Sequence, residues 1–254
     1  MSQALHHPSK LRRLDWASIL SYAALACWLG IRLWPHVPQR PWLALTAALL
    51  AYLAADLVSG LVHWAADTWG STDLPVIGPA VLGPFREHHR DPLAITRHDF
   101  VETNGNNCLI SLPVLGVAIW LVPDPGEPGT IFLSSFLGAL VFWVLLTNQF
   151  HKWAHLPSPP ALLAFLQRWH LILPPAHHAL HHNRPFTSHY CITTGWLNWP
   201  LGWMRFFPLL EWCITGCTGA LPRRDDLGTR DATAVMAETM PMPPAASADT
   251  RVPR

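Results

Sequence analysis

Residues 42–66 read WLALTAALLAYLAADLVSGLVHWAA, an apolar run that contains one carboxylate, Asp56, and one imidazole, His63. An α-helix rises about 1.5 Å per residue, so about 20 apolar residues are enough to cross the hydrocarbon layer of a bilayer. The run therefore predicts a transmembrane helix. Its histidine lies near the end at which the chain turns polar, at Asp67.

Three further apolar runs predict transmembrane helices on the same grounds. Residues 14–34 and 130–150 are long, and residues 107–122 form a shorter run that Pro113 interrupts. Apolar residues make up 50% of the 254-residue chain and charged residues 13%, a balance that excludes disorder and an ordinary soluble surface. We therefore predict an all-α integral membrane protein with about four transmembrane helices.

Positive charge divides the connectors into two kinds. Residues 35–41 and 123–129 are short turns, whereas the segments that follow the second and fourth runs are longer and basic. Basic loops favour the cytosolic side of a membrane. This rule predicts that the N-terminus, residues 67–106 and everything after residue 150 lie in the cytosol, against a bacterial inner membrane or an ER-like membrane.

Composition divides the chain into three parts. Residues 1–13 form a basic cytosolic segment, residues 14–227 form the membrane domain, and residues 228–254 form a tail of Ala, Pro, Thr and Met without periodicity, which predicts disorder. Within the membrane domain, residues 161–173 predict a short helix at the interface. Residues 193–219 predict interfacial or re-entrant helices rather than a fifth span.

Histidines gather at the same-side ends of the apolar runs, so the sequence predicts a cytosolic, histidine-rich helical cap. Three pairs are four residues apart, a spacing that puts both rings on one face of a helix. Pro174 and Pro175 suit the start of the helix that carries the last four. Neutral imidazole suits iron, zinc, copper and nickel, and the number of rings is enough for two metals. The ten candidate ligands are His63, His88, His89, His98, His151, His155, His177, His178, His181 and His182.

Two of these histidines, His88 and His89, are adjacent. Adjacent side chains project in different directions from a helix, so we expect this pair to serve different metals. Taken alone, the pair would equally fit a solvated polar loop. The other clusters favour the metal site.

Polar residues of the second run fall on one stripe of the predicted helix, at Asp56, Gly60, His63 and Asp67. A carboxylate near the middle of a membrane is expensive unless it is paired, so Asp56 indicates either a catalytic role or a structural one with a buried partner. We expect Asp67 to accept a hydrogen bond from an imidazole and orient it. Further candidates for ligation or for orienting the ligands are His170, His189, Asp99, Asn104 and Asn107.

Several other classes of function are excluded or disfavoured. The formal charge of +1 gives no nucleic-acid signature, and the five cysteines include no CxxC pair. The chain also lacks HExxH, GxSxG and P-loop motifs. Ligation by imidazoles alone at a bilayer surface favours oxygen activation on a lipid chain, because a hydrolytic zinc site is expected to include a carboxylate or a cysteine. A membrane metal-binding or metal-transport protein is the alternative that is not an enzyme, and it predicts polar ligands inside several spans.

Four stretches of sequence resemble a known family. They are DLVSGLVHWAADTWG (56–70), PFREHHRDPLAITRHDFVETNGNNC (84–108), NQFHKWAH (148–155) and LPPAHHALHHNRPFTSHYCITTGWLNWP (173–200). In this order they are similar to the Kua, or plasmanylethanolamine desaturase, family of lipid desaturases, which includes bacterial CarF and a plant plastid desaturase of phosphatidylglycerol. The family's histidine motifs match the ten candidate ligands and His170. Residues 184–190 depart from the pattern, because the family places its histidine before the position of His189.

The resemblance implies a membrane enzyme with two iron ions, which zinc can replace in purified protein. It implies dioxygen as co-substrate and an external electron donor such as cytochrome b5, ferredoxin or flavodoxin. The implied reaction converts the 1-O-alkyl chain of plasmanylethanolamine to the vinyl ether of plasmenylethanolamine, a plasmalogen. The alternative outcome at such a centre is desaturation or hydroxylation of another phospholipid, such as the acyl chains of phosphatidylglycerol.

Overall fold

The computed structural model describes residues 9–75, 77–122 and 127–223, and all of its regular elements within these ranges are helices. The predicted tail at 228–254 and most of the predicted N-terminal segment lie outside the described residues. The all-α prediction is confirmed.

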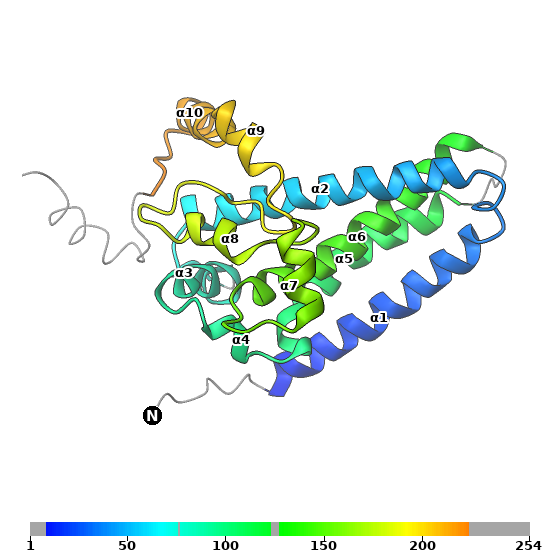
Figure 1. Ribbon diagram of the computed structural model, residues 1–254, viewed down its shortest axis with the longest axis horizontal. Coiled ribbons are helices and arrows are strands. Elements are labelled where there is room, and N and C mark those ends of the chain that lie inside the picture. Colours follow the sequence, from blue (N-terminus) through cyan, green and yellow to red (C-terminus); the bar gives the residue numbers. More distant parts are fainter. Residues whose placement is uncertain (1–8, 76, 123–126, 224–254) are drawn as a thin grey trace, which may run out of the picture.

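Four long helices run side by side and form the body of the molecule (Figure 1). They are α1 (Ser9–Leu33), α2 (Pro41–Thr68), α5 (Phe100–Trp120) and α6 (Pro128–Ala154). Helix α1 packs on α5, α5 on α6, and α6 on α2. The long apolar runs of the sequence thus become neighbours in one bundle.

Three of these helices are long and apolar enough to cross a membrane: Leu11–Leu33 within α1, Pro41–Thr68 and Pro128–Ala154. The fourth expected span corresponds to α5, which begins seven residues before the predicted start at 107. Its first two turns carry Glu102, Asn104 and Asn107, which lower its hydropathy. Pro113 lies inside α5 and does not end it, so the predicted interruption is wrong.

The outer surface of the bundle is apolar and its interior holds a packed core. Leu20 and Ile31 of α1 are 63% and 72% exposed, as expected of side chains that face lipid. Between α1, α5 and α6, a core forms around Leu29, Leu115 and Val141.

Short helices collect at the end of the bundle at which α2 and α6 finish and α1 and α5 begin (Figure 1). They are η1 (Gly78–Leu82), α3 (Gly83–Arg90), α4 (Ala94–Arg97), α7 (Ala161–Arg168) and α8 (Pro175–His181). As predicted, Pro174 and Pro175 begin α8, at its N-cap and first helical position. The histidine-rich helical cap is therefore present at one end of the molecule.

The last described helices lie beside the final turns of α2. Residues 193–219 form α9 (Asn198–Trp203) and α10 (Phe206–Thr218) instead of one long span. Trp64 of α2 donates its Nε1–H to Glu211 of α10 at 2.9 Å, and Phe207 packs on Tyr190 and Trp64. These contacts hold α10 against α2 close to the cap.

Candidate metal centre

Nine side chains in the cap form two groups whose potential ligand atoms lie within 4.8 Å of one another. We call them the five-histidine group and the mixed group. The five-histidine group consists of His88, His151, His155, His178 and His182. The mixed group consists of His63, Asp67, His89 and His181.

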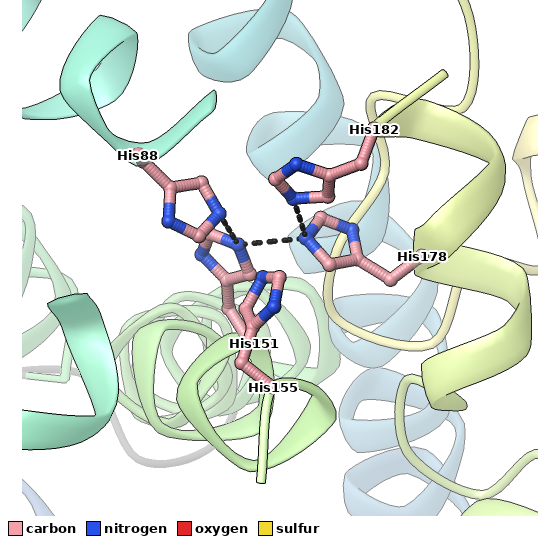
Figure 2. A group of neighbouring side chains, drawn as sticks. All are labelled: His88, His151, His155, His178 and His182. Atoms are coloured by element: carbon pink, nitrogen blue, oxygen red, sulfur yellow. Dashed lines mark hydrogen bonds between the residues drawn. The ribbon is translucent and has the colours of Figure 1, made fainter. Parts of the chain in front are cut away.

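Three elements contribute to the five-histidine group. Figure 2 shows the five histidine rings pointing toward one another. His151 lies in the last turn of α6 and His155 directly follows it, whereas His178 lies in α8 and His182 directly follows α8. His88 comes from α3. The Nε2 atom of His151 lies 2.9 Å from Nε2 of both His88 and His178, and Nε2 of His182 lies 3.0 Å from that of His178. Each i,i+4 pair reaches the group from one helix face.

The mixed group is assembled from the last turns of α2 together with α3 and α8. Oδ2 of Asp67 lies 3.4 Å from Nε2 of His63, 3.6 Å from that of His89 and 3.5 Å from that of His181. The Nε2 atoms of His89 and His181 are 2.9 Å apart. All four residues are buried.

The donor atoms of the five-histidine group fit a cation better than they fit one another. Nε2 of a neutral imidazole has either one hydrogen or one lone pair and can make one two-centre hydrogen bond, so the three contacts along the row His182, His178, His151 and His88 cannot all be such bonds. A metal ion would instead accept a lone pair from every ring. In the mixed group, Nε2 of His63 is buried without a hydrogen bond to any described residue, which fits a second ion.

Burial keeps these rings neutral. Desolvation lowers the pKa of His155 to about 4, and desolvation with the nearby His155 and His89 lowers the pKa of His182 to about 3. Desolvation likewise holds the pKa of His178 well below its usual range. A neutral ring has a lone pair available, so the cap presents its histidines in the form that binds metal.

Backbone carbonyls orient two rings of the mixed group. Nδ1 of His63 lies 3.1 Å from the carbonyl oxygen of Tyr190, and Nδ1 of His181 lies 2.8 Å from that of Ser188. A carbonyl can only accept, so in both rings the hydrogen is on Nδ1 and Nε2 is left for a metal. His89 is positioned differently, because its ring stacks on Phe186 at a centroid distance of 4.5 Å.

Two of the ten candidate ligands lie outside both groups. His98 is exposed at the end of α4, and its carbonyl accepts a hydrogen bond from Lys152. His177 is buried, but its Nε2 accepts from Asn198 at 2.9 Å. A side chain at Gly195 would meet the His177 ring at 2.6 Å, so this ring is packed against a loop and not against the rings of the two groups.

The outer histidine candidates are also separate from the two groups. His170 is exposed, and its carbonyl accepts a hydrogen bond from the Nε1–H of Trp196 at 2.7 Å. His189 contacts the hydroxyl of Ser188 through Nδ1 at 3.0 Å, and its ring lies 5.2 Å from that of His177.

Three polar candidates of α5 hold the bundle together. Asp99 caps α5 by accepting from the N–H groups of Val101 and Glu102. Asn104 donates to the carbonyl of Phe100 within α5, whereas Asn107 donates at 2.8 Å to the carbonyl of Val144 in α6. None of the three belongs to either group.

The two acidic candidates of α2 have different surroundings from those expected. Asp67 lies among the ring nitrogens as a potential ligand, so the centre does not consist of imidazoles alone. Asp56 is about 10 Å farther along the helix from His63, at seven residues of about 1.5 Å each. Its carboxylate accepts four backbone N–H groups of residues 193–197. These contacts favour the structural interpretation of Asp56.

Sequence reasoning missed Arg86, which is 3% exposed. Its guanidinium donates to the carbonyls of Trp69 and Gly70 at 2.9 and 3.1 Å, where α2 ends. Because α3 carries Arg86 two residues before His88, this contact fixes α3 against α2 and brings the two groups together. The signal in the sequence that could have identified Arg86 was the presence of an arginine inside a run of potential ligands.

Comparisons with known proteins agree with this geometry. Residues 52–225 match the family model of the lipid desaturase domain. The chain is 58% identical over 226 residues to plasmanylethanolamine desaturase of Myxococcus xanthus. This alignment covers 89% of the chain and 80% of that relative. It is 44% identical over 233 residues to plasmanylethanolamine desaturase 1 of Mus musculus, covering 88% and 84% respectively.

A plant relative is more distant. The chain is 34% identical over 190 residues to the chloroplastic fatty acid desaturase 4 of Arabidopsis thaliana, covering 74% of the chain and 56% of that relative. No solved structure matches the chain. With a family model that spans most of the membrane bundle and relatives aligned over most of their length, the chain belongs to the lipid desaturase family.

Proposed function

We propose that this protein is an oxidoreductase that desaturates the 1-O-alkyl chain of plasmanylethanolamine to give the vinyl ether of plasmenylethanolamine. The observation that carries the proposal is the pair of buried ligand groups at the end of a membrane bundle. The substrate follows from the two relatives named plasmanylethanolamine desaturase. The reaction removes two hydrogens from the lipid, and with dioxygen, two electrons and two protons it yields the vinyl ether and two waters.

Iron held by the two groups would supply the activation of dioxygen and the removal of hydrogen from C1 and C2 of the chain. The protein's own residues position and protect this centre. Ser188 and Tyr190 fix the rings of His181 and His63, and Asp67 adds a negative charge that favours a cation. Burial of the ligands excludes water from the site. Zinc would bind the same donors in place of iron.

We further propose that the cap and the N-terminus are cytosolic, in a bacterial inner membrane or an ER-like membrane. The basic residues of the segments around the cap support this orientation. The two electrons would come from a donor such as cytochrome b5, ferredoxin or flavodoxin. We assign the desaturase to residues 14–227.

Membranes that contain the protein, 1-O-alkyl phosphatidylethanolamine and an electron-donor system provide the test. The expected product has lost two hydrogens and releases an aldehyde in acid, as vinyl ethers do. Incubation without dioxygen should give no product, and membranes with the His178→Ala variant should give none either. Product formed without dioxygen would contradict the proposal.

The plant relative is named a fatty acid desaturase and supports a second candidate, desaturation of an acyl chain. The substrate that we propose for this candidate is another phospholipid, such as phosphatidylglycerol. Its product is stable to acid. Lipid profiles of the same membranes supplied with phosphatidylglycerol therefore separate the two candidates. An acid-stable product that lacks two hydrogens, with no vinyl ether, would favour the second one.

A further inference from the structure

Residues 190–197 form an irregular segment that packs along the inner stripe of α2, the stripe that carries Asp56, Ser59, Gly60 and His63. A side chain at Gly60 would meet Cys191 Sγ at 2.5 Å, so the segment lies directly on the helix. Asp56 is 12 residues before the end of α2, about 18 Å along the axis. Irregular backbone at membrane depth is stable only where protein groups satisfy its N–H and C=O groups.

Side chains provide nearly all of the acceptors that this segment needs. The N–H of Cys191 donates to Asn198 Oδ1 at 2.8 Å, and that of Ile192 donates to Ser59 Oγ at 3.0 Å. Four of the N–H groups that follow donate to Asp56. Its Oδ1 accepts from Thr193, Thr194 and Gly195 at 3.1, 2.8 and 2.9 Å, and its Oδ2 accepts from Leu197 at 3.1 Å.

Asp56 is fully buried, and the four N–H dipoles compensate its charge. Hydrogen bonds to a charged acceptor are stronger than neutral ones, so this carboxylate is the main anchor of the segment. Replacement by asparagine would keep one oxygen for three of the donors. Its amide nitrogen would then face the Leu197 N–H, donor against donor.

The other end of the same segment reaches the mixed group. The carbonyl of Tyr190 orients His63, and that of Ser188, two residues earlier, orients His181. The segment also contacts α6, which carries His151, because Thr193 Oγ1 lies 2.7 Å from Thr147 Oγ1 and Ile192 packs with Ala154. No ring of the five-histidine group, however, has a described hydrogen bond to residues 188–197. A shift of the anchored segment therefore acts on the mixed group through two direct hydrogen bonds, and on the five-histidine group only indirectly, through α6 and through ring contacts between the two groups.

We propose that Asp56 is a positioning residue for the mixed group. By anchoring residues 193–197 on α2, it holds the carbonyls of Ser188 and Tyr190 where they aim Nε2 of His181 and His63 at a common ion. The inference rests on the proposed function for the identity of that ion. It does not require Asp56 to touch substrate or metal.

The first experiment measures metal affinity. Purified Asp56→Asn and wild-type protein, stripped of metal, are titrated with cobalt(II), and the visible absorption of bound cobalt reports the two sites. Loss of an orienting partner typically lowers metal affinity about 10- to 100-fold, and we expect a loss of this size at one site and a clearly smaller change at the other. The His155→Ala variant identifies the remaining site, because it removes a ligand of the five-histidine group.

The second experiment needs no metal. Histidines of the stripped protein are modified with diethyl pyrocarbonate and the rates are read by mass spectrometry. We expect His63 and His181 to react about fivefold faster in Asp56→Asn, the factor in rate that corresponds to one lost hydrogen bond, while the rates of His88 and His178 change clearly less. Asp15→Asn is the matched control, because Asp15 is another buried aspartate, 6% exposed, which lies on α1 and is packed against Gly105. It should behave as wild type in both assays.

The results separate the inference from the proposed function. If wild-type protein fails to bind two ions, the proposed function is wrong, and the modification rates still decide the role of Asp56. Equal effects on both groups, or none on either, would overturn the inference. If Asp56→Asn does not fold, Ser59→Ala removes a single acceptor from the same segment and should give a smaller effect in the same direction.

Discussion

Neighbouring histidines have different roles in this cap because successive residues of a helix point about 100° apart. His88 joins the five-histidine group and His89 the mixed group. On α8, His177 contacts Asn198, whereas His178 belongs to the five-histidine group. Being a histidine therefore does not by itself decide the role of a residue in this cap. Substitutions of two adjacent histidines, one inside and one outside a group, provide matched tests of these roles.

The pair His177 and His178 gives the sharpest of these tests. His178→Ala removes a proposed ligand, so we expect desaturase activity to fall by at least about 100-fold, since even an outer partner of a ligand is typically worth 10- to 100-fold. His177→Ala removes one hydrogen bond, worth about 1 kcal/mol, and should retain most of the activity. Vinyl ether formed per chain measures both. Equal loss in the two variants would contradict the assignment of His177.

At the residue scale, residue type and spacing were enough to identify the candidate ligands, but not to assign a role to every one of them. The i,i+4 pairs of His151 and His178 fall in one group, as helix geometry predicts, whereas the third such pair is divided, because His181 belongs to the mixed group and His177 contacts Asn198. For Asp67 an orienting role was expected, whereas Asp56, on the same stripe of α2, was left open between a catalytic and a structural role. Their difference depends on residues 193–197, whose position is a matter of tertiary packing more than 130 residues away.

At the scale of elements, a capping box fixes the start of α5 and connects it to α1. Asp99 and Glu102 form a capping box at the start of α5, and Arg12 of α1 pairs with Asp99 at 2.7 Å. The hydrogen bonds from the Glu102 backbone and from Arg12 lower the pKa of Asp99 below its usual value. The charged carboxylate thus links two long helices at the end of the bundle that carries the cap.

We expect Asp99→Ala to destabilise the protein by about 1 kcal/mol, the usual worth of an N-cap. Because the folded pKa of Asp99 lies below the unfolded one, its contribution is complete above about pH 4 and disappears as the pH falls through the folded value. Thermal unfolding in detergent at neutral pH and near pH 3 measures the difference. Asp91→Ala is the control, since Asp91 makes an exposed ion pair with Arg97 and caps no long helix. A difference that does not shrink in acid would contradict this account.

Element boundaries show where sequence reasoning succeeds. Helix α8 begins at the prolines as predicted, because proline favours a first turn for local reasons. Helix α5 was predicted too short, because its first turns are polar. Asn107 and Asn148 bury their amides against carbonyls of the neighbouring helix, and such pairing becomes visible only when α5 and α6 are packed together.

At the scale of the whole molecule, α3 and α8, which contribute to both ligand groups, lie at one end of the bundle, and the turn between α1 and α2 lies at the other (Figure 1). Basic segments around the cap predict that this end is cytosolic. In a background without the native cysteines, Gln39→Cys in the turn should react with an impermeant maleimide added outside intact cells. Thr187→Cys in the cap should react only after lysis. The reverse pattern would contradict the proposed orientation.

Metal also contributes to the stability of the cap as a whole, because the ligands come from α2, α3, α6 and α8 and converge only in the folded protein. An ion whose free concentration is about 100 times its dissociation constant stabilises the folded state by about 2.7 kcal/mol. For a chain of this size that corresponds to roughly 5–10 °C in Tm for each ion. We therefore expect removal of metal by a chelator to lower the Tm in two steps, and readdition of iron(II) or zinc to restore it. The His178→Ala variant, which keeps only the mixed group intact, should show one step. A Tm that chelation leaves unchanged would mean that the ligands are held together by packing alone.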